Sequence, residues 1–458
     1  MRSNRFLLAT LLLVSCTPRM PDQAASATPT AAARPTASRT RTLAPPPTPA
    51  PSRTPFADRL TSGTTVDAET LARHQRIFEQ LWNTLDAQYV YPDFNGVDWD
   101  ATYEEIKASV DAGMSDEDFW RIMSEMIGRL DDGHSRFLTP TEAREQDSQM
   151  EGSLAYGGIG IEAGEQIEKR QAVIYDVFRG GPAEESGLRP HDVILSIDGL
   201  SAVGPGGASN MDRIRGAPGT PVTLVVKSPG EAPREVTLIR RRVSGAQMVT
   251  GRLLSEAPGD RFGYMFVPNL WEQSIAPSAR QTLIGLMTGG SLDGLIIDMR
   301  TNEGGLSTNL LALLGFFTEG NQGEFVSRDG ARRLVVSADP IGNSQEVPIV
   351  VLTGEASHSY AEVFSGVLRE AGRARLVGQT TQGNIETIYG YNFEDGSRAW
   401  IARETFVPPS GDDWERTGLI PNVIVDVDWD EFTAEKDPAI AAALELLAPS
   451  AGVVSPAD

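Results

Sequence analysis

The first folded stretch of the chain, from about residue 67 to residue 143, has apolar residues at the spacing of amphipathic helices. Positions that recur every three or four residues share one face of a helix, and such a face packs against a core. Ser115 is followed three positions later by Asp118, a spacing that is typical of a helix start. The pattern therefore predicts a helical region with two core-facing stripes. Their members are Ile77, Phe78, Leu81, Trp82 and Leu85 in the first, and Phe119, Ile122, Met123, Met126, Ile127 and Leu130 in the second.

Between about residues 152 and 242 the pattern changes to short strands separated by glycine turns. Three segments stand out, Gly157–Ile161, Gly181–Leu188 and Asp192–Gly199. Together they resemble a PDZ domain, with His191 in place of the glycine that usually precedes the aspartate. A PDZ groove binds a peptide as an added strand and holds its carboxylate on backbone N–H groups. The resemblance assigns carboxylate binding to Gly157, Gly158, Ile159 and Gly160, and the alternative is a generic small β domain with glycine turns.

From about residue 261 onward, strands alternate with helices, which predicts an α/β fold. Gly294–Met299 and Pro348–Thr353 are short apolar runs typical of buried strands, and Leu310–Phe317 is typical of an apolar helix. Pro348–Thr353 leads into the small-residue turn Gly354–Ser359 and then into a second helical pattern. This order places a serine hydroxyl at the start of a helix, beside backbone N–H groups that stabilise negative charge. The turn therefore suggests nucleophilic catalysis by a serine.

The amino-terminal end has the pattern of a lipoprotein signal peptide. Arg2 and Arg5 precede an apolar run from Phe6 to Val14, which is too short to span a bilayer. Leu-Val-Ser-Cys, ending at Cys16, resembles the bacterial lipobox, in which the cysteine is lipidated and becomes the new N-terminus. We expect residues 1–16 to be this signal, with an ordinary secretory signal as the alternative. Residues 17–60, rich in Pro, Ala, Thr and Ser, are expected to be a disordered tether outside the cytoplasm.

The composition excludes several classes of function. A formal net charge of -22 argues against nucleic acid, which needs clustered Lys and Arg, and against a polybasic membrane contact. Cys16 is the single cysteine, so neither a disulfide framework nor a cysteine metal site is expected. No His, Asp and Glu residues have the spacing of metal ligands, and His74 and His191 are expected at the surface. No phosphate-binding loop precedes a helix. We therefore expect no metal and no cofactor.

Three more motifs, in order with the PDZ-like segments, resemble the carboxyl-terminal processing peptidases, also called tail-specific proteases. Leu130–Leu138 resembles a cap motif of that family, Gly294–Gly305 its glycine-rich signature, and Ser357–Glu362 its serine motif. The resemblance covers nearly all of residues 75–430. It implies a multidomain α+β protein with three folded parts. These are a helical cap over residues 64–150, a PDZ β-sandwich or barrel over 152–242, and an α/β peptidase core like that of ClpP and crotonase over 250–447.

The same resemblance assigns roles around the serine motif. It implies that Ser359 is the nucleophile, with Ser357 as a turn residue. It also implies an oxyanion site made by the N–H groups of Tyr360 and of Gly304 or Gly305.

The lysine that normally activates the serine in this family is missing. Its place in the motif Gly378–Asn384 is taken by Asn384, and the chain has no lysine between Lys227 and Lys436. An amide has no basic nitrogen, so Asn384 can replace the lysine only as a polar hydrogen-bonding group. Either another residue is the base, or the core is inactive.

For the first case, tricorn-type proteases of the same superfamily use a serine with a histidine and a glutamate. His134 and Glu415 match those positions, although Arg416 and Asn422 depart from the motif around the glutamate. A histidine has a pKa near the operating pH, and a carboxylate can fix its tautomer. The chain is therefore predicted to be a lipid-anchored serine endopeptidase that captures polypeptide C-termini through its PDZ domain. The alternative is an inactive pseudopeptidase that serves as a PDZ peptide-binding or scaffold lipoprotein.

Overall fold

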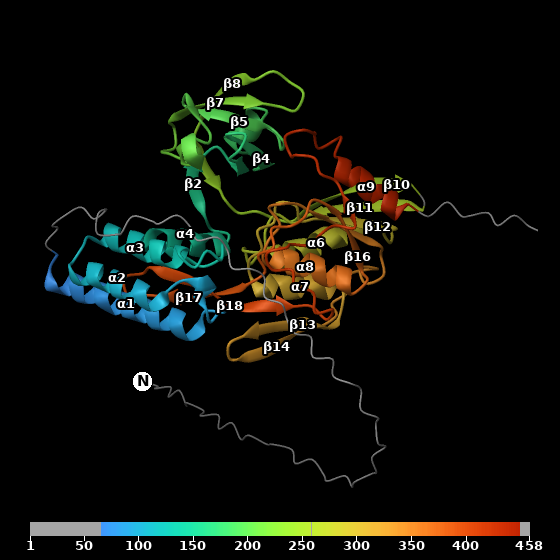
Figure 1. Cartoon of the computed structure of the whole chain (residues 1–458). Helices are drawn as coiled ribbons and strands as arrows, with labels where there is room; N and C mark the ends of the chain where they lie inside the picture. Colours follow the sequence, from blue (N-terminus) through green and yellow to red (C-terminus); the bar gives the residue numbers. More distant parts are fainter. Residues whose placement is uncertain (1–65, 258, 449–458) are drawn as a thin grey trace, which may run out of the picture. The chain divides into compact units, whose positions relative to one another are not determined.

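The computed structural model describes residues 66–257 and 259–448 (Figure 1). Cys16 and the predicted signal and tether lie outside the described residues. Among the described helices, none combines the length and the apolar character needed to cross a bilayer.

In the described part of the chain, four α-helices and one short 3-10 helix precede the small β region. Asp67 caps the first α-helix, because its side chain accepts a hydrogen bond from the N–H of Thr70. Ser115 caps the third α-helix, because its side chain accepts a hydrogen bond from the N–H of Asp118. The predicted helix start at Ser115 is thereby confirmed. The elements are α1 (Ala68–Gln88), the one-turn helix η2 (Phe94–Gly96), α2 (Trp99–Asp111), α3 (Asp116–Gly128) and α4 (Pro140–Met150).

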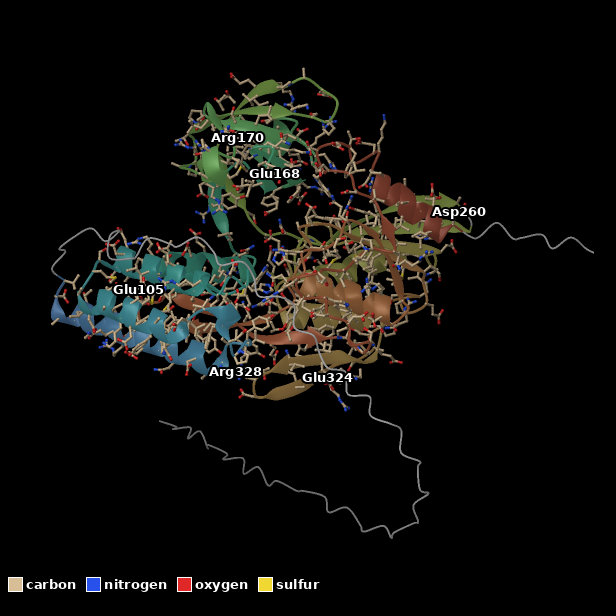
Figure 2. The ribbon with its side chains drawn as sticks, in the orientation of Figure 1. Glu105, Glu168, Arg170, Asp260, Glu324 and Arg328 are labelled. Atoms are coloured by element: carbon tan, nitrogen blue, oxygen red, sulfur yellow. The ribbon has the colours of Figure 1, made fainter. Side chains whose placement is uncertain are left out.

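The core of these helices includes residues from a strand far along the chain. β1 (Arg136–Leu138) pairs antiparallel with β18 (Arg398–Val407), and Phe137 lies opposite Ala399. Phe137, Ala399 and Ile401 belong to one buried cluster with the apolar stripes of α1 and α3. Arg328, labelled in Figure 2, adds a hydrogen bond between the two regions. Its guanidinium donates to the Asp86 carbonyl of α1 at 2.5 Å. The helical cap and the peptidase-like region therefore share a core.

The small β region has a hydrophobic core of its own, formed by residues between Ile159 and Leu238. Its main sheet has the strand order β3-β4-β5-β7-β8, with β6 paired to β5, so β3 is an edge strand. The strands are β2 (Ala155–Gly158), β3 (Ile161–Gln166), β4 (Gln171–Val177), β5 (Val193–Ile197), β6 (Leu200–Ser201), β7 (Pro221–Lys227), β8 (Arg234–Ile239) and β9 (Arg241–Ser244). The helices are α5 (Pro182–Glu185), η3 (Pro205–Gly207) and η4 (Met211–Ile214).

The remaining chain folds around a six-stranded sheet with the order β10-β11-β12-β15-β16-β19, in which all pairs except β10 with β11 are parallel. Alternate residues of its central strands face opposite sides. Ile297 and Val351 pack with α6, α7 and α8 in one cluster, whereas Ile296 and Val350 pack with α9 in another. The strands are β10 (Thr250–Ala257), β11 (Asp260–Phe266), β12 (Gly294–Asp298), β15 (Ile349–Thr353), β16 (Ala374–Gly378) and β19 (Val423–Ile424). The helices are α6 (Ile275–Leu286), α7 (Ser307–Phe317), α8 (Tyr360–Glu370) and α9 (Pro438–Leu447).

A second sheet joins β1 to β18, β13 and β14, with β17 also paired to β18. Its further strands are β13 (Gly320–Ser327), β14 (Gly330–Val336) and β17 (Thr387–Asn392). The expected combination of helical, small β and α/β regions is confirmed, while the exact domain boundaries stay predictions. β15, in the six-stranded sheet, leads through the serine turn to α8, whereas β1, in the second sheet, directly follows the turn that holds the cap histidine.

Candidate active site

Ser359 lies where the buried strand β15 gives way to α8, as the N-cap residue of that helix. Its backbone has φ 58° and ψ -131°, a combination that is strained for any residue with a Cβ. The N–H of Ser359 donates to the carbonyl of Asn384 at 2.7 Å, which helps to hold this conformation. Within the described residues its hydroxyl makes no hydrogen bond, so the oxygen is available for chemistry. Ser357 instead turns the chain, because its hydroxyl donates to the Met299 carbonyl at 2.7 Å.

The glycine-rich loop that follows β12 passes directly beside this serine. A Cβ added to Gly304 would lie 2.9 Å from both Ser359 Oγ and the amide nitrogen of Tyr360, so only glycine fits there. The N–H of Gly304 is already used, since it donates to Asn302 Oδ1 at 2.9 Å. The N–H groups of Gly305 and Tyr360 have no acceptor among the described residues. Of the three predicted oxyanion residues, these two retain a free donor.

His134 lies in the turn between α3 and β1. Asp132 Oδ1 accepts from the N–H groups of His134 and Ser135 at 2.9 and 2.7 Å, which fixes the turn. A Cβ on Gly133 would lie 2.9 Å from Asn384 Nδ2, so this turn packs against the residue that replaces the family lysine. The rings of His134 and His358, the neighbour of Ser359, are 6.0 Å apart between centroids. The structure thus brings His134 and Ser359 into one site, although no hydrogen bond joins them.

A buried carboxylate that the sequence analysis did not name contacts the histidine. Glu386 Oε2 lies 3.2 Å from His134 Nδ1, and Glu386 Oε1 accepts a hydrogen bond from the Tyr91 hydroxyl at 2.9 Å. A carboxylate accepts hydrogen bonds only, so His134 Nδ1 carries the proton and Nε2 is left as the basic nitrogen. Glu386 follows Asn384 by two positions, and residues two apart in extended chain share a face. That spacing was the one signal for it in the sequence.

Glu415, the predicted orienting group, does not contact His134 itself, because Glu386 lies between the two residues. Its Oε2 accepts from the N–H of Ile385 at 3.0 Å, and its carboxyl group is hydrogen-bonded to Glu386. Burial, together with the negative charge of Glu386, raises the pKa of Glu415 to about 9. Glu415 therefore keeps its proton at neutral pH and can share it with the Glu386 carboxylate in a hydrogen bond. Glu386 therefore orients His134, and Glu415 acts through Glu386.

Asn384 is held in place by Glu362, the last residue of the serine motif. The fully buried carboxylate of Glu362 accepts hydrogen bonds from the Gly383 and Asn384 N–H groups at 2.8 and 2.9 Å, and from the Thr381 hydroxyl. Burial raises the pKa of Glu362, while these donors oppose the shift. The side-chain oxygen of Asn384 is buried without a partner among the described residues. Asn384 is thus a polar neighbour of the catalytic groups, with no basic atom.

The other three histidines are less suited than His134 to act as the base. Burial, and then the nearby His134, lower the pKa of His358 to about 4, so its ring is a weaker base than an ordinary histidine. His74 and His191, expected at the surface, are buried, which corrects that expectation. His74 stacks on Phe119 and His191 stacks on Trp429, with ring centroids 4.2 and 4.5 Å apart. Both are packed parts of the structure.

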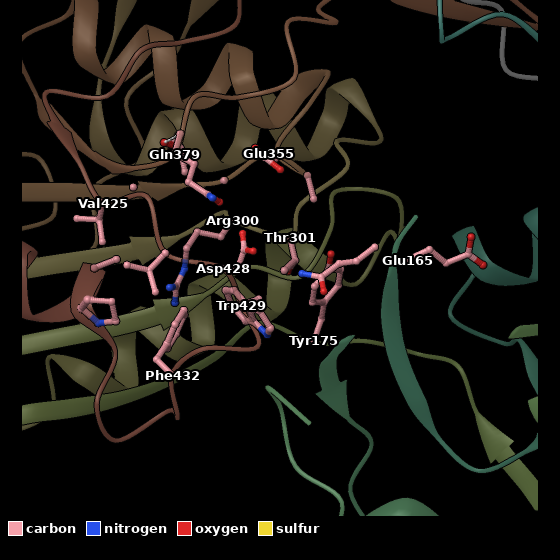
Figure 3. Close-up of a pocket in the computed structure, with 18 residues that line it drawn as sticks. Glu165, Tyr175, Arg300, Thr301, Glu355, Gln379, Val425, Asp428, Trp429 and Phe432 are labelled. Carbon is pink, nitrogen blue, oxygen red and sulfur yellow. Dashed lines mark hydrogen bonds between the residues drawn. The ribbon is translucent and has the colours of Figure 1, made fainter. Parts of the chain in front are cut away.

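Two cavities lie near the serine turn, and only one reaches the serine. The cavity in Figure 3 has a volume of about 270 Å³ and is lined by Arg300, Glu355 and Trp429, but not by Ser359. Its Arg300 is paired with Asp298 and Asp437 at 2.6 and 2.7 Å, which leaves no unpaired cation for a ligand. A second cavity of about 220 Å³ is lined by Ser359 itself. Within the described chain, no three His, Cys, Asp or Glu side chains are grouped so as to hold a metal ion.

The predicted carboxylate-binding loop of the small β region lies beside the edge strand β3. The carbonyls of Ile159 and Gly160 accept hydrogen bonds from Ala183 and Phe178, at 2.9 and 3.0 Å. The N–H groups of the same two residues have no acceptor in the part of the chain that the structure describes. Gly157 and Gly158 pair with Arg242 and Arg241 of β9. The loop thus presents two free donors next to an open strand edge, and its role in carboxylate binding stays a prediction.

Comparison with protein families and known proteins gives a consistent result. Three family models match this chain. They are peptidase family S41 over residues 261–425, the tricorn protease C1 domain over 71–128, and the PDZ domain over 147–227. The chain is 28% identical over 397 residues to the carboxyl-terminal-processing protease of Synechocystis, covering 84% of this chain and 89% of that protein. It is 26% identical to the carboxy-terminal processing protease CtpB of Bacillus subtilis, covering 66% and 61%. The solved photosystem II D1 C-terminal processing protease is 24% identical, with a TM-score of 0.58 and coverage of 84% and 99%, and it shares the fold.

Proposed function

Because the chain belongs to peptidase family S41 and is a serine-type peptidase, we propose that it is an endopeptidase acting near polypeptide C-termini, with Ser359 as nucleophile and His134 as general base. One observation carries this assignment of the base. The Glu386 carboxylate holds His134 Nδ1 at 3.2 Å within the site that contains Ser359, and this leaves Nε2 free to accept a proton. The lysine usual in the family is therefore not needed for activation.

In the first step, Ser359 Oγ attacks the carbonyl carbon of the peptide bond and its proton moves to His134 Nε2. The resulting imidazolium is stabilised by Glu386, while the N–H groups of Gly305 and Tyr360 stabilise the oxyanion. The tetrahedral intermediate then collapses, and the leaving amine takes the proton from Nε2. The acyl group stays on Oγ. A water molecule next gives its proton to Nε2 and attacks the ester, which releases the new C-terminus and restores the serine.

The free edge of β3 supports capture of a polypeptide end by the PDZ domain. A peptide that adds to this edge would direct its terminal carboxylate to the N–H groups of Ile159 and Gly160. Such binding selects chain ends over internal segments. It fits the names of the relatives, which are carboxyl-terminal processing proteases.

Labelling of the serine tests the proposal directly. The full-length protein is treated with a fluorophosphonate, and the modified residue is identified by mass spectrometry. We expect modification of Ser359, loss of labelling in Ser359→Ala, and a large drop in His134→Gln. His358→Gln is the matched control, because a histidine with a pKa of about 4 is a weak base, and the variant should keep most of the labelling. If folded protein is not labelled at any pH, the proposed function is wrong.

The absent lysine favours a second candidate, an inactive pseudopeptidase that binds peptides through its PDZ domain. Asn384 has no basic nitrogen, and the described structure contains no hydrogen bond between His134 and Ser359. This candidate predicts that Ser359→Ala changes no activity, whereas a peptide with a free C-terminal carboxylate still binds. Proteolysis that disappears in Ser359→Ala would reject it.

We also propose that the protein is anchored outside the cytoplasm by a lipid on Cys16. The support is the sequence alone: a basic start, a short apolar run and a lipobox-like ending at the single cysteine. In a bacterial host, an alkyne fatty acid should label the wild type, while Cys16→Ser should be unlabelled and recovered away from the membrane fraction. Equal labelling of both proteins would exclude this anchor.

A further inference from the structure

The walls of the cavity of about 220 Å³ beside Ser359 combine aromatic and aliphatic side chains with polar ones. They come mainly from the chain before α6, from the starts of α7 and α8, and from β17 and β18. The side chains that define it are Trp271, Ser307, Tyr360, Ile388, Tyr389 and Trp400.

The position of the cavity relative to the oxyanion donors identifies which substrate residue would enter it. Gly305 and Tyr360, whose N–H groups are free, line the cavity together with Ser359. The carbonyl that Ser359 attacks belongs to the residue on the amino side of the cut bond, the P1 residue. Its Cα is bonded directly to that carbonyl carbon, so its side chain has to lie next to the nucleophile and the oxyanion donors. The cavity is therefore in the place of a P1 pocket.

The size and the walls of the cavity suit an aromatic ring. An apolar cavity of roughly 150 Å³ is enough to bind benzene in another protein, and this one is larger. The rings of Trp271 and Trp400 lie 6.0 Å apart between centroids at 70°, an edge-to-face pair in the cavity wall to which a third ring could be added. A small side chain would leave most of this space unfilled.

The charged groups at the cavity are already paired. Arg332 donates to Glu404 through Nε and Nη2 at 2.9 and 2.7 Å, and its guanidinium lies 4.1 Å from the centre of the Phe325 ring. Glu386 is bonded to Tyr91 and His134. A charged P1 side chain would lose its water in the cavity and gain no free opposite charge, which is unfavourable.

We propose that this cavity is a P1 pocket that selects peptide bonds following phenylalanine or tyrosine. The inference rests on the proposed peptidase function and adds its substrate class. It names the walls of the pocket, above all Trp271 and Trp400, as the basis of the selection.

The test compares peptides that differ only at P1, with Phe, Tyr, Leu, Ala, Asp or Lys in an otherwise identical sequence. For the full-length protein, kcat/KM for Phe or Tyr should exceed that for Ala by at least about 10- to 200-fold, the range that a single methylene group contributes in a hydrophobic pocket. Asp and Lys should be cut more slowly than Leu. Equal rates for Phe and Ala, or a preference for Asp or Lys, would overturn the pocket assignment.

A ring placed in the pocket by mutation should compete with the substrate ring. Ser307, the first residue of α7, is exposed and lines the cavity, so Ser307→Phe adds a ring at its wall with little risk to folding. The Phe-to-Ala ratio of kcat/KM should fall at least tenfold. Thr308→Phe is the matched control, because Thr308 is the next exposed residue of α7 and lies outside the pocket lining, and it should keep the wild-type ratio. An unchanged ratio in Ser307→Phe would contradict the proposal.

These outcomes distinguish failure of the P1 pocket assignment from failure of the proposed peptidase function. Cleavage that depends on Ser359 but shows no preference at P1 would overturn the pocket alone. Absence of both cleavage and fluorophosphonate labelling would overturn the proposed function, and the P1 inference with it.

Discussion

At the scale of single residues, the proton shared by Glu386 and Glu415 makes stability depend on pH. Folded Glu415 keeps its proton up to about pH 9, whereas an unfolded glutamate loses it near pH 4.5. Between these values the folded state binds more protons, so the free energy of unfolding falls as the pH rises. The loss of stability caused by ionisation of Glu415 is absent below pH 4.5 and complete above about pH 9.

Glu415→Gln should remove this cost, because the neutral amide keeps the size of the side chain and an acceptor for the Ile385 N–H. At pH 9 the variant should be more stable than the wild type by at least about 1.4 kcal/mol, the value of one pKa unit. Near pH 4 the two proteins should be alike. Urea unfolding at both pH values measures the difference, with the exposed Glu145→Gln of α4 as control. A wild-type stability that does not decline toward pH 9 relative to Glu415→Gln would contradict a shared proton.

The strained backbone of Ser359 also lowers the free energy of unfolding. At φ 58° and ψ -131°, a Cβ is unfavourable and glycine is not. Ser359→Gly should therefore be more stable than Ser359→Ala by about 1 kcal/mol or more, although both lack the hydroxyl. The comparison needs only denaturant unfolding of the two variants. Equal stabilities would mean that the turn relaxes when the hydroxyl is removed, and that the strain belongs to the serine itself.

At the scale of elements, the loop from Thr381 to Asn384 depends on one carboxylate at the start of α8. Glu362→Ala would leave the N–H groups of Gly383 and Asn384 and the Thr381 hydroxyl without their acceptor. Unpaired buried groups cost about 1–3 kcal/mol each, so we expect a loss of about 3 kcal/mol or more in the free energy of unfolding. Labelling of Ser359 should fall as well, because the Asn384 carbonyl would no longer hold the serine N–H.

The control for Glu362→Ala is Glu370→Ala, at the other end of α8. Glu370 has none of these buried donors, so its replacement should change stability by less than about 0.5 kcal/mol. Both variants can be compared by urea unfolding and by fluorophosphonate labelling under folded conditions. If Glu362→Ala is as stable and as reactive as Glu370→Ala, Glu362 does not organise the loop.

The elements also show how far sequence patterns predict this molecule. Apolar periodicity gave the helices of the cap, the buried strands β12 and β15, and the serine turn between β15 and α8, because those patterns reflect local geometry and burial. The contact between His134 and Glu386 joins residues 252 positions apart. It follows from the pairing of β1 with β18, which no local pattern contains. The burial of His74 and His191 was missed for a similar reason, since their aromatic partners are supplied by other elements.

At the scale of the whole molecule, the buried clusters predict which parts unfold together. Phe137, Ala399 and Ile401 belong to the same cluster as the cap helices, whereas the PDZ domain has a separate core that includes Leu224. Cap and peptidase core should therefore form one cooperative unit, and the PDZ domain another.

Two matched substitutions test this division. Leu224 and Ile401 are both fully buried, and replacing either by alanine should cost about 2–5 kcal/mol in its own unit. Hydrogen exchange followed by mass spectrometry should show faster exchange in Leu224→Ala only for the PDZ strands, such as β5. Ile401→Ala should speed exchange in β18 and in α1 together, and leave β5 unchanged. Because α1 and β18 are more than 300 positions apart, their joint response would come from the shared core; a response of β18 alone would show that the cap folds by itself.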